Sequence, residues 1–187
     1  MFAKILVAID SSTIGKTVFN KALDLAKATG ASIMLLHVLS YEDGMPNLPT
    51  SFGREYYTGL SSKALEIYQQ QCKEFENQGL KLLQSLANQA IAAGVGAEFT
   101  QNHGSPGQTI CDLAQNLQSD LIVMRRRGKS GINELIMGSV SNYVLHHASC
   151  SVLVVQHLVN KESVVQTDQA MVIPIQKMFG TDKAFKI

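Results

Sequence analysis

Short runs of apolar residues, separated by longer polar and mixed segments, dominate the pattern of this chain. Three of them, residues 4–9, 32–39 and 121–124, show little alternation between apolar and polar positions. Such runs are typical of strands buried on both faces of a parallel sheet that is covered by helices. Residues 151–156 predict a further strand, and residues 95–101, which alternate in part, predict a strand at a sheet edge.

Between these runs, apolar residues recur at spacings of three and four, which predicts helices. One helix covers residues 14–26, and a long one covers about 61–93, with Gly79 as a point where it bends or is interrupted. Ser105-Pro106 opens a third helix, and residues 139–147 form a fourth. This order predicts an α/β fold: a doubly wound, five-stranded parallel sheet with helices on both faces, Rossmann-like.

Two segments fall outside this alternation. Residues 40–59 contain two prolines, three glycines and three tyrosines, so we expect a long loop there. Residues 157–187 do not continue the pattern of strands and helices, so we expect a tail that is either flexible or a docking segment. The predicted organisation is therefore one domain over residues 1–156 followed by a C-terminal tail.

Composition narrows the class of protein. Of 187 residues, 45% are hydrophobic and 17% charged, which is typical of a globular core, and the net charge of +1 gives no global basic field for nucleic acid. No apolar run approaches membrane-spanning length, and Asp10 interrupts the N-terminal run where a signal peptide would continue. Three cysteines without paired spacing are typical of reduced thiols. We expect a cytoplasmic protein with no membrane or nucleic-acid partner.

The candidate chemistry lies after the predicted strands, because ligands of open parallel sheets bind beyond the strands' carboxyl ends. Asp10 follows the first strand, and the glycine-rich stretch 125–141 follows the fourth. Within it, Gly128 and Gly138 stand near a helix start, where free amides and the helix dipole attract phosphate. Three consecutive arginines begin the stretch and suggest a polyphosphate clamp; a solvated basic loop is the competing interpretation.

Familiar catalytic and phosphate motifs are missing. A Walker motif ending at Gly128-Lys129-Ser130 would need glycine at Val123, a dinucleotide fingerprint from Gly94 would need glycine at Phe99, and no nucleophile elbow exists. No general base other than Asp10 stands near the glycine-rich stretch. Rapid turnover is therefore not expected, and the catalytic activity is expected to be slow ATP hydrolysis at most.

Other polar residues admit two interpretations each. Asp10 either ligates Mg²⁺ or bonds a ribose hydroxyl, or it caps the first helix. His37 is expected to be a packed core residue rather than a ligand or base. His146 and His147, with Cys150 nearby, resemble a metal cluster, but neighbouring residues on a helix point about 100° apart, so a position at the helix C-terminus is favoured.

Four segments together resemble the universal stress protein (UspA-like) superfamily. They are KILVAID at the N-terminus, LLHV in the second run, GSP before the third helix, and the block DLIVM followed by RGKSGINELIMGSVSNYVLHHASCSVLVV. The resemblance covers about residues 2–156. It implies sheet order 3-2-1-4-5 and a homodimer formed through the last strand, Ser151 to Gln156.

The resemblance also implies a nucleotide site. One branch of the superfamily binds ATP or AMP through G-x2-G-x9-G-[ST]; here Gly128, Gly138 and Ser139 match, and Arg125 replaces the first glycine. That arginine either blocks the nucleotide or pairs with its phosphates. By resemblance, Asp10 faces the ribose or a metal, with Mg²⁺ optional. The other implied residues flank the adenine (Ala8, Val38), line the base and ribose side (Met124, Arg125) and form the phosphate cradle (Gly128, Gly138, Ser139, Val140, Ser141).

Two functions follow from these observations. The first is an adenine-nucleotide-binding module in stress response or signalling, homodimeric and with little or no catalysis. The second is a non-binding interaction protein of the same fold, in which Arg125 has ended nucleotide affinity. An adenylating or phosphoryl-transfer enzyme is the least favoured, because the catalytic motifs are missing.

Overall fold

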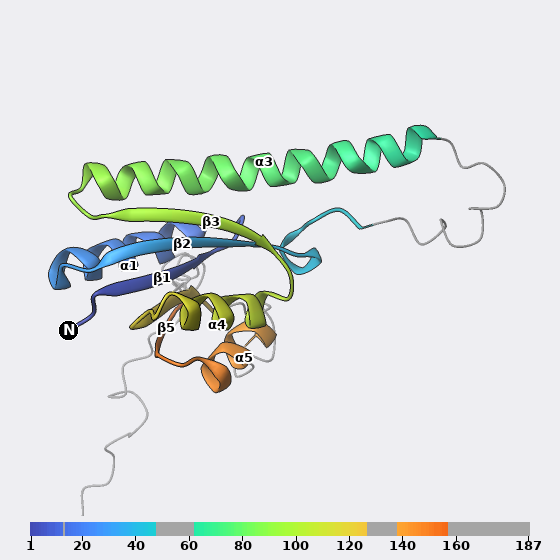
Figure 1. Ribbon diagram of the computed structural model, residues 1–187. Coiled ribbons are helices and arrows are strands. Elements are labelled where there is room, and N and C mark those ends of the chain that lie inside the picture. The colour runs from blue at the N-terminus through green and yellow to red at the C-terminus, as the bar shows by residue number, and fades with distance from the viewer. Residues whose placement is uncertain (13, 48–61, 127–137, 157–187) are drawn as a thin grey trace, which may run out of the picture. The chain divides into compact units, whose positions relative to one another are not determined.

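A computed structural model describes residues 1–12, 14–47, 62–126 and 138–156. Strands and helices alternate along the chain (Figure 1). Their bounds, in chain order, are β1 Lys4–Ile9, α1 Gly15–Thr29, β2 Ser32–Leu39, the short 3-10 helix η1 Tyr41–Asp43, α3 Ser62–Ala92, β3 Ala97–His103, α4 Pro106–Asn116, β4 Leu121–Arg125, α5 Ser139–His147 and β5 Ser151–Val155.

The five strands form one parallel sheet, as the sequence pattern predicts, in the order β3-β2-β1-β4-β5 that the family resemblance implies. Because the chain moves outward from β1 to β2 and β3, then returns to β4 on the other side of β1, the order reverses between β1 and β4. This reversal leaves the carboxyl ends of β1 and β4 side by side with helices on opposite faces, which is where ligands of such sheets bind.

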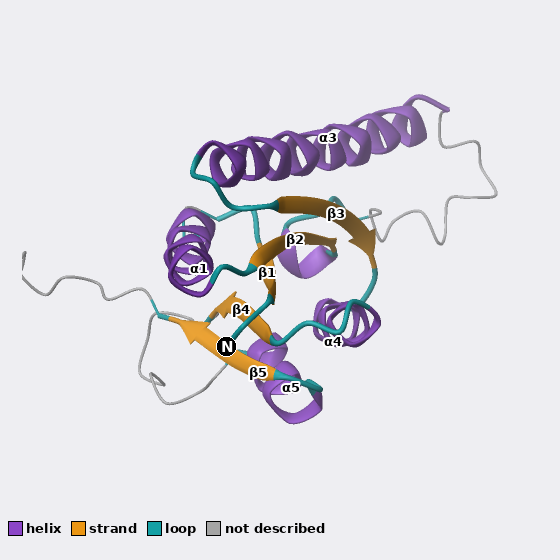
Figure 2. Ribbon diagram, turned by 60° about the vertical axis from the view of Figure 1, so that its left-hand side comes forward, coloured by secondary structure: helices purple, strands orange, loops and turns teal. Residues whose placement is uncertain are grey.

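Helices cover both faces of the sheet (Figure 2). Strand residues alternate between the faces, so Ile5 and Val7 pack with α1 and α3, whereas Leu6 packs with α4 and α5. The two apolar clusters account for the near-continuous hydrophobic runs, since each central strand is buried on both sides.

Several boundaries differ from the sequence prediction. The third strand begins at Ala97 rather than residue 95, because Gly94, with a φ of 81°, and Val95 belong to the turn that closes α3. Helix α3 continues through Gly79 without interruption, so of the two predicted effects the interruption was wrong. Helix α4 starts at Ser105-Pro106 as predicted. The predicted loop at 40–59 begins with η1, and residues 48–61 lie outside the described residues, as do 157–187.

The predictions about cysteine and histidine side chains fare as follows. Cys72, Cys111 and Cys150 are free thiols. His146 and His147 lie in the last turn of α5, and no group of three or more possible metal ligands occurs among the described residues. Within those residues no helix is both long and apolar enough to span a membrane.

Candidate functional site

A pocket opens at the carboxyl ends of β1, β2 and β4, at the point where the strand order reverses. Residues from β1, β2, η1, α4, β4 and α5, or from the turns next to them, line it. They are Ala8, Ile9, Asp10, Leu36, Val38, Ser40, Asp43, Pro106, Ile110, Met124, Arg125, Val140 and Ser141.

The apolar walls of the pocket follow from strand alternation. Ala8, Val38 and Met124 occupy positions whose side chains point to the face covered by α4 and α5. Ala8 is paired with Leu36 across the β1–β2 ladder, so small and large side chains meet there. Because the pocket lies where this apolar face ends, it combines a hydrophobic floor with a polar rim.

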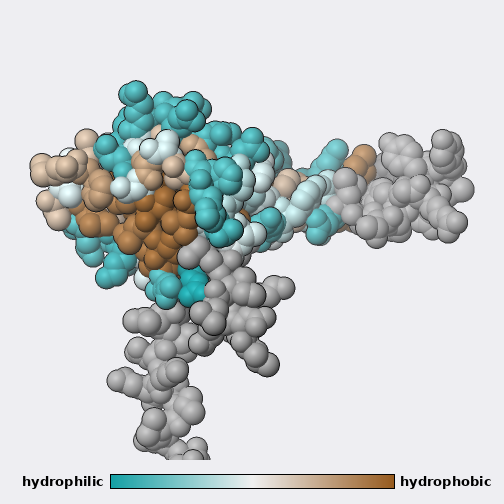
Figure 3. All heavy atoms as spheres, turned by 90° about the horizontal axis from the view of Figure 1, so that it is seen from below, coloured by the Kyte–Doolittle hydropathy of each residue, from teal (hydrophilic) through white to brown (hydrophobic). Residues whose placement is uncertain are grey.

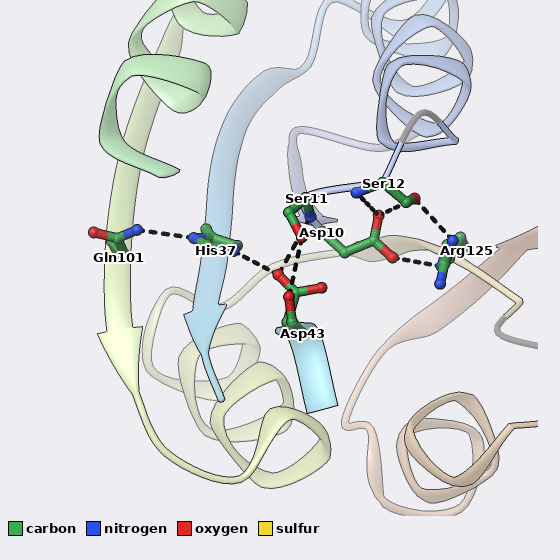
Figure 4. A network of polar contacts seen from close by, with 7 residues as sticks. All are labelled: Asp10, Ser11, Ser12, His37, Asp43, Gln101 and Arg125. Carbon is green, nitrogen blue, oxygen red and sulfur yellow. Dashed lines mark hydrogen bonds and ion pairs between the residues drawn. The ribbon is translucent and has the colours of Figure 1, made fainter. Parts of the chain in front are cut away.

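One part of the rim is a closed group of three side chains, shown in Figure 4. The Arg125 guanidinium forms an ion pair through Nε with Oδ2 of Asp10. Its Nη1 donates to Ser12 Oγ over 2.8 Å, and Ser12 donates from Oγ to Asp10 Oδ1 over 2.6 Å. The side chains of Arg125 and Asp10 are only 18% and 17% exposed. The arginine of β4 is therefore bound to the carboxylate that follows β1.

This geometry corrects one interpretation of Asp10. The N-cap of α1 is Ile14, whose side chain makes no capping hydrogen bond. Instead, Asp10 accepts hydrogen bonds from the backbone and side chain of Ser12, which hold the turn after β1. Asp10 is thus an ion-paired rim residue rather than a helix cap.

A second polar group lies beside the first and was not foreseen. His37 is 1% exposed in β2, as expected for a core residue, but its ring is bonded at both nitrogens. Nε2 lies 2.7 Å from Asp43 Oδ2, and Gln101 Nε2 lies 2.8 Å from Nδ1 (Figure 4). Asp43 also accepts a hydrogen bond from the Ser11 amide. The network joins β3, β2 and η1 to the turn after β1.

Helix α3 covers this network closely. The Phe75 ring lies 5.9 Å from the His37 ring, centroid to centroid. A Cβ built at Gly79 would lie 2.2 Å from Gln101 Nε2 and 2.5 Å from His37 Nδ1. Only glycine therefore lets α3 approach β2 and β3 this closely, which explains its place in an otherwise regular helix.

The first turn of α5 forms another side of the site. Gly138 is the N-cap, and Val140 and Ser141 line the pocket. Ser141 is buried, and its Oγ donates to the Gly138 carbonyl over 3.0 Å. The helix start points backbone amides and the positive end of the dipole toward this region, which suits an anion.

The residues predicted for the site are largely brought together. Seven line the pocket: Ala8, Asp10, Val38, Met124, Arg125, Val140 and Ser141. Gly138 and Ser139 start α5 next to it, and Gly128 lies outside the described residues. Sequence reasoning missed Ser12 and Asp43 as polar partners of the site. It also missed the pairing of Asp10 with Arg125, for which the adjacency of β1 and β4 in the expected sheet order is a usable signal.

The thiols near this half of the molecule do not add a nucleophile. Burial raises the pKa of Cys111 on α4, and burial also raises the pKa of Cys150 before β5. Both therefore stay protonated at neutral pH, and a protonated thiol is a poor nucleophile. The chemistry of the site consists of an apolar floor, hydrogen-bonding groups and a neutralised carboxylate.

The fold and the pocket define a Rossmann-like α/β protein with a ligand pocket at its topological switch point. The chain belongs to the universal stress protein family, whose family model matches residues 1–156. Universal stress protein Sll1388 from Synechocystis sp. is 36% identical over 156 residues, which are 83% of this chain and 99% of that protein.

Solved structures share the fold. A universal stress protein in complex with cAMP has a TM-score of 0.54 and 20% identity, with 83% of this chain and 97% of that chain covered. A universal stress protein family protein from Arabidopsis thaliana with AMP bound has a TM-score of 0.53 and 22% identity, covering 85% and 94% of the two chains. At these identities the likeness establishes a common fold.

Proposed function

We propose that this chain is a cytoplasmic, homodimeric module of stress response or signalling that binds an adenine nucleotide, ATP or AMP, with little or no catalysis. The observation that carries the proposal is the pocket at the switch point, where a hydrophobic floor meets a polar rim and a helix start. Planar apolar bases and anionic phosphates are complementary to these two parts. The cAMP and AMP bound to the two structural relatives support the choice of an adenine ligand.

Within this proposal the residues take distinct roles. Ala8, Val38 and Met124 form the floor for the adenine, and Asp10 and Arg125 face the ribose side. Gly138, Ser139, Val140 and Ser141 supply the amides of the phosphate cradle together with Gly128. Asp10 is bound to Arg125, and Asp43 lies against His37, so the two carboxylates among the described lining residues already have partners inside the protein. That arrangement favours binding over turnover.

The homodimer is proposed to form through β5. Among the described residues this strand pairs only with β4, so within that part of the chain its other edge presents backbone donors and acceptors. Leu145 on α5 and Leu153 on β5 are exposed. Helix α5 and strand β5 lie on the lower side of the molecule in Figure 1. Seen from that side, the surface shows a continuous apolar area (Figure 3). Large apolar patches of this kind mark interaction surfaces.

Titration calorimetry of the whole chain with AMP and with ATP tests the proposed nucleotide binding. The expected result is saturable binding that is lost in Ala8→Leu, because the larger side chain enters the pocket floor. Ala3→Leu is the matched control, since Ala3 is exposed before β1 at the opposite end of the sheet. Equal binding by both variants would place the ligand elsewhere, and no binding by the folded wild type would reject the proposal.

One observation favours the second candidate, an interaction protein that binds no nucleotide. The Arg125 side chain reaches across the rim to Asp10, where the ribose is proposed to lie. If the guanidinium blocks the ligand, Arg125→Gly gains affinity for AMP. If it pairs with phosphate, the same variant loses affinity. An unchanged affinity would reject both roles for Arg125.

A further inference from the structure

A divalent cation at Asp10 is the natural first expectation for a nucleotide site with a carboxylate on its rim. Mg²⁺ takes carboxylate oxygens, waters and phosphate oxygens in nearly ideal octahedral geometry. To bind there, it needs a carboxylate oxygen that is free to turn toward the ligand. The described contacts of Asp10 do not fit that requirement.

Both carboxylate oxygens of Asp10 are committed within the protein (Figure 4). Oδ2 lies against the positive Arg125 guanidinium, and Oδ1 accepts from Ser12 at both the amide and the hydroxyl. Arg125 in turn donates to Ser12, so the three side chains fix one another. A cation entering here would meet a carboxylate whose charge is already balanced and would be repelled by the guanidinium.

The other carboxylate of the pocket is also engaged. Asp43 Oδ2 accepts from the Ser11 amide and lies 2.7 Å from His37 Nε2, with the Asp43 side chain 8% exposed. Among the described residues there is no group of three or more possible metal ligands. The pocket therefore holds its acidic groups in pairs with basic or hydrogen-bonding partners.

We propose that the Arg125 guanidinium takes the place of a divalent metal at the Asp10 carboxylate. The site therefore binds its nucleotide without Mg²⁺. The proposal rests on the proposed nucleotide binding and specifies the form of the ligand. A planar guanidinium that cannot lose its proton at neutral pH is suited to this task. The ligand is an uncomplexed nucleotide, and a monophosphate is the best probe because it chelates Mg²⁺ more weakly than a triphosphate does.

The test is titration of AMP into the full chain, once in EDTA and once in excess Mg²⁺. Wild type is expected to bind AMP equally in both, within about twofold, well below the usual range of coupling factors between two ligands. Arg125→Gln exposes an unbalanced Asp10 carboxylate, so Mg²⁺ is expected to improve its AMP affinity by about fivefold or more. Lys27→Gln removes a positive charge at an exposed position in the last turn of α1, outside the pocket lining, and is expected to behave as wild type.

Two results would overturn the proposal: a wild type whose AMP affinity rises about fivefold or more with Mg²⁺, or an Arg125→Gln variant that shows no response to Mg²⁺. Circular dichroism checks that the variant folds, and where it does not, the wild-type comparison alone decides.

A wild type that binds no AMP in either buffer contradicts the proposed function, and Mn²⁺ binding to the free protein, read by electron paramagnetic resonance, then decides this inference. Arg125→Gln is expected to bind more Mn²⁺ than wild type and than the double variant with Asp10→Asn. Equal binding by Arg125→Gln and either of these two proteins would refute the role of Arg125.

Discussion

Single residues control how closely the elements around the site approach one another. Gly79 lets α3 lie against His37 and Gln101, and Asp120 holds the amino ends of two strands together through backbone amides of Ala3 and Lys4. Neither residue lines the pocket. Substituting either residue is therefore expected to change the free energy of unfolding first, and the geometry of the site only as a consequence.

Gly79→Ala is expected to destabilise the fold even though alanine is the better helix former by about 1 kcal/mol. The new methyl group would meet the His37 ring, which is held by hydrogen bonds on both sides, and would displace Gln101 from it. We expect a net loss of about 1–3 kcal/mol in the free energy of unfolding, measured by urea denaturation. Asn77→Ala, at an exposed position of the same helix, is the control and should be neutral or stabilising. A stabilised Gly79→Ala would show that α3 does not press on the network.

Asp120 makes stability depend on pH at the acidic end. Hydrogen bonds from the Ala3 and Lys4 amides hold the pKa of its carboxyl below the ordinary 3.8. A lowered pKa in the folded state means that the stabilisation is fully present above pH 3.8 and is lost as pH falls through the folded-state pKa. Asp120→Asn should therefore lower the urea midpoint at pH 7, and the difference from wild type should shrink on acidification below pH 3.8. A difference that stays constant with pH would contradict this role.

Among the secondary-structure elements, the short helix η1 directly follows β2 and is held against the sheet by side-chain contacts. Its position is set by Asp43, which contacts His37 in β2 and the Ser11 amide after β1. Ser11 Oγ also donates to the Asp43 carbonyl. Two strand ends and η1 thus share one side chain, at the edge of the candidate site.

Asp43→Ala is expected to release η1 from the sheet. The buried His37 Nε2 would lose its partner, which costs about 1–3 kcal/mol in the free energy of unfolding. The Ser11 amide would lose its acceptor, so its hydrogen exchange, followed by NMR, should accelerate. Asp24→Ala, at an exposed position on α1, controls for the substitution itself. Unchanged exchange at Ser11 would show that Asp43 does not hold this turn.

Elements made of local sequence were the easiest to predict. The central strands, such as Lys4–Ile9, can be predicted because both of their faces are apolar. The start of α4 can be predicted because Ser105 is a favourable N-cap and Pro106 is favoured at the first helical position. The start of β3 was misplaced because Val95 is apolar but serves the turn after α3. The pattern of apolar residues indicates which positions are buried and not which element they belong to. A buried turn residue such as Val95 therefore looks like part of a strand.

The candidate site was predictable in its location and less so in its contacts. Strand ends and glycine-rich stretches point to the pocket from sequence alone. The partners of His37 come from η1 and from Gln101, 64 residues further along, so no local pattern links them. Likewise, the sequence places Arg125 at the rim, but only the fold turns its guanidinium toward Asp10.

For the whole molecule, assembly through β5 is the main expectation beyond the single chain. Leu153→Glu should give monomers, because a charge on the exposed side of the edge strand would have to be buried in the proposed interface. Sedimentation velocity distinguishes the two states. Leu80→Glu, an equally apolar and exposed position on α3, should remain dimeric. A Leu153→Glu protein that remains dimeric would place the interface elsewhere.

The proposed nucleotide site lies at the carboxyl ends of β1, β2 and β4. The most direct measurement is a ¹⁵N-resolved NMR titration of the whole chain with AMP. Saturable shifts are expected at the amides of Asp10, Val38 and Val140, complete by about 1 mM ligand, with none at Gly96 near the strands' amino ends. A spectrum that AMP leaves unchanged, or shifts that gather around Gly96, would contradict it.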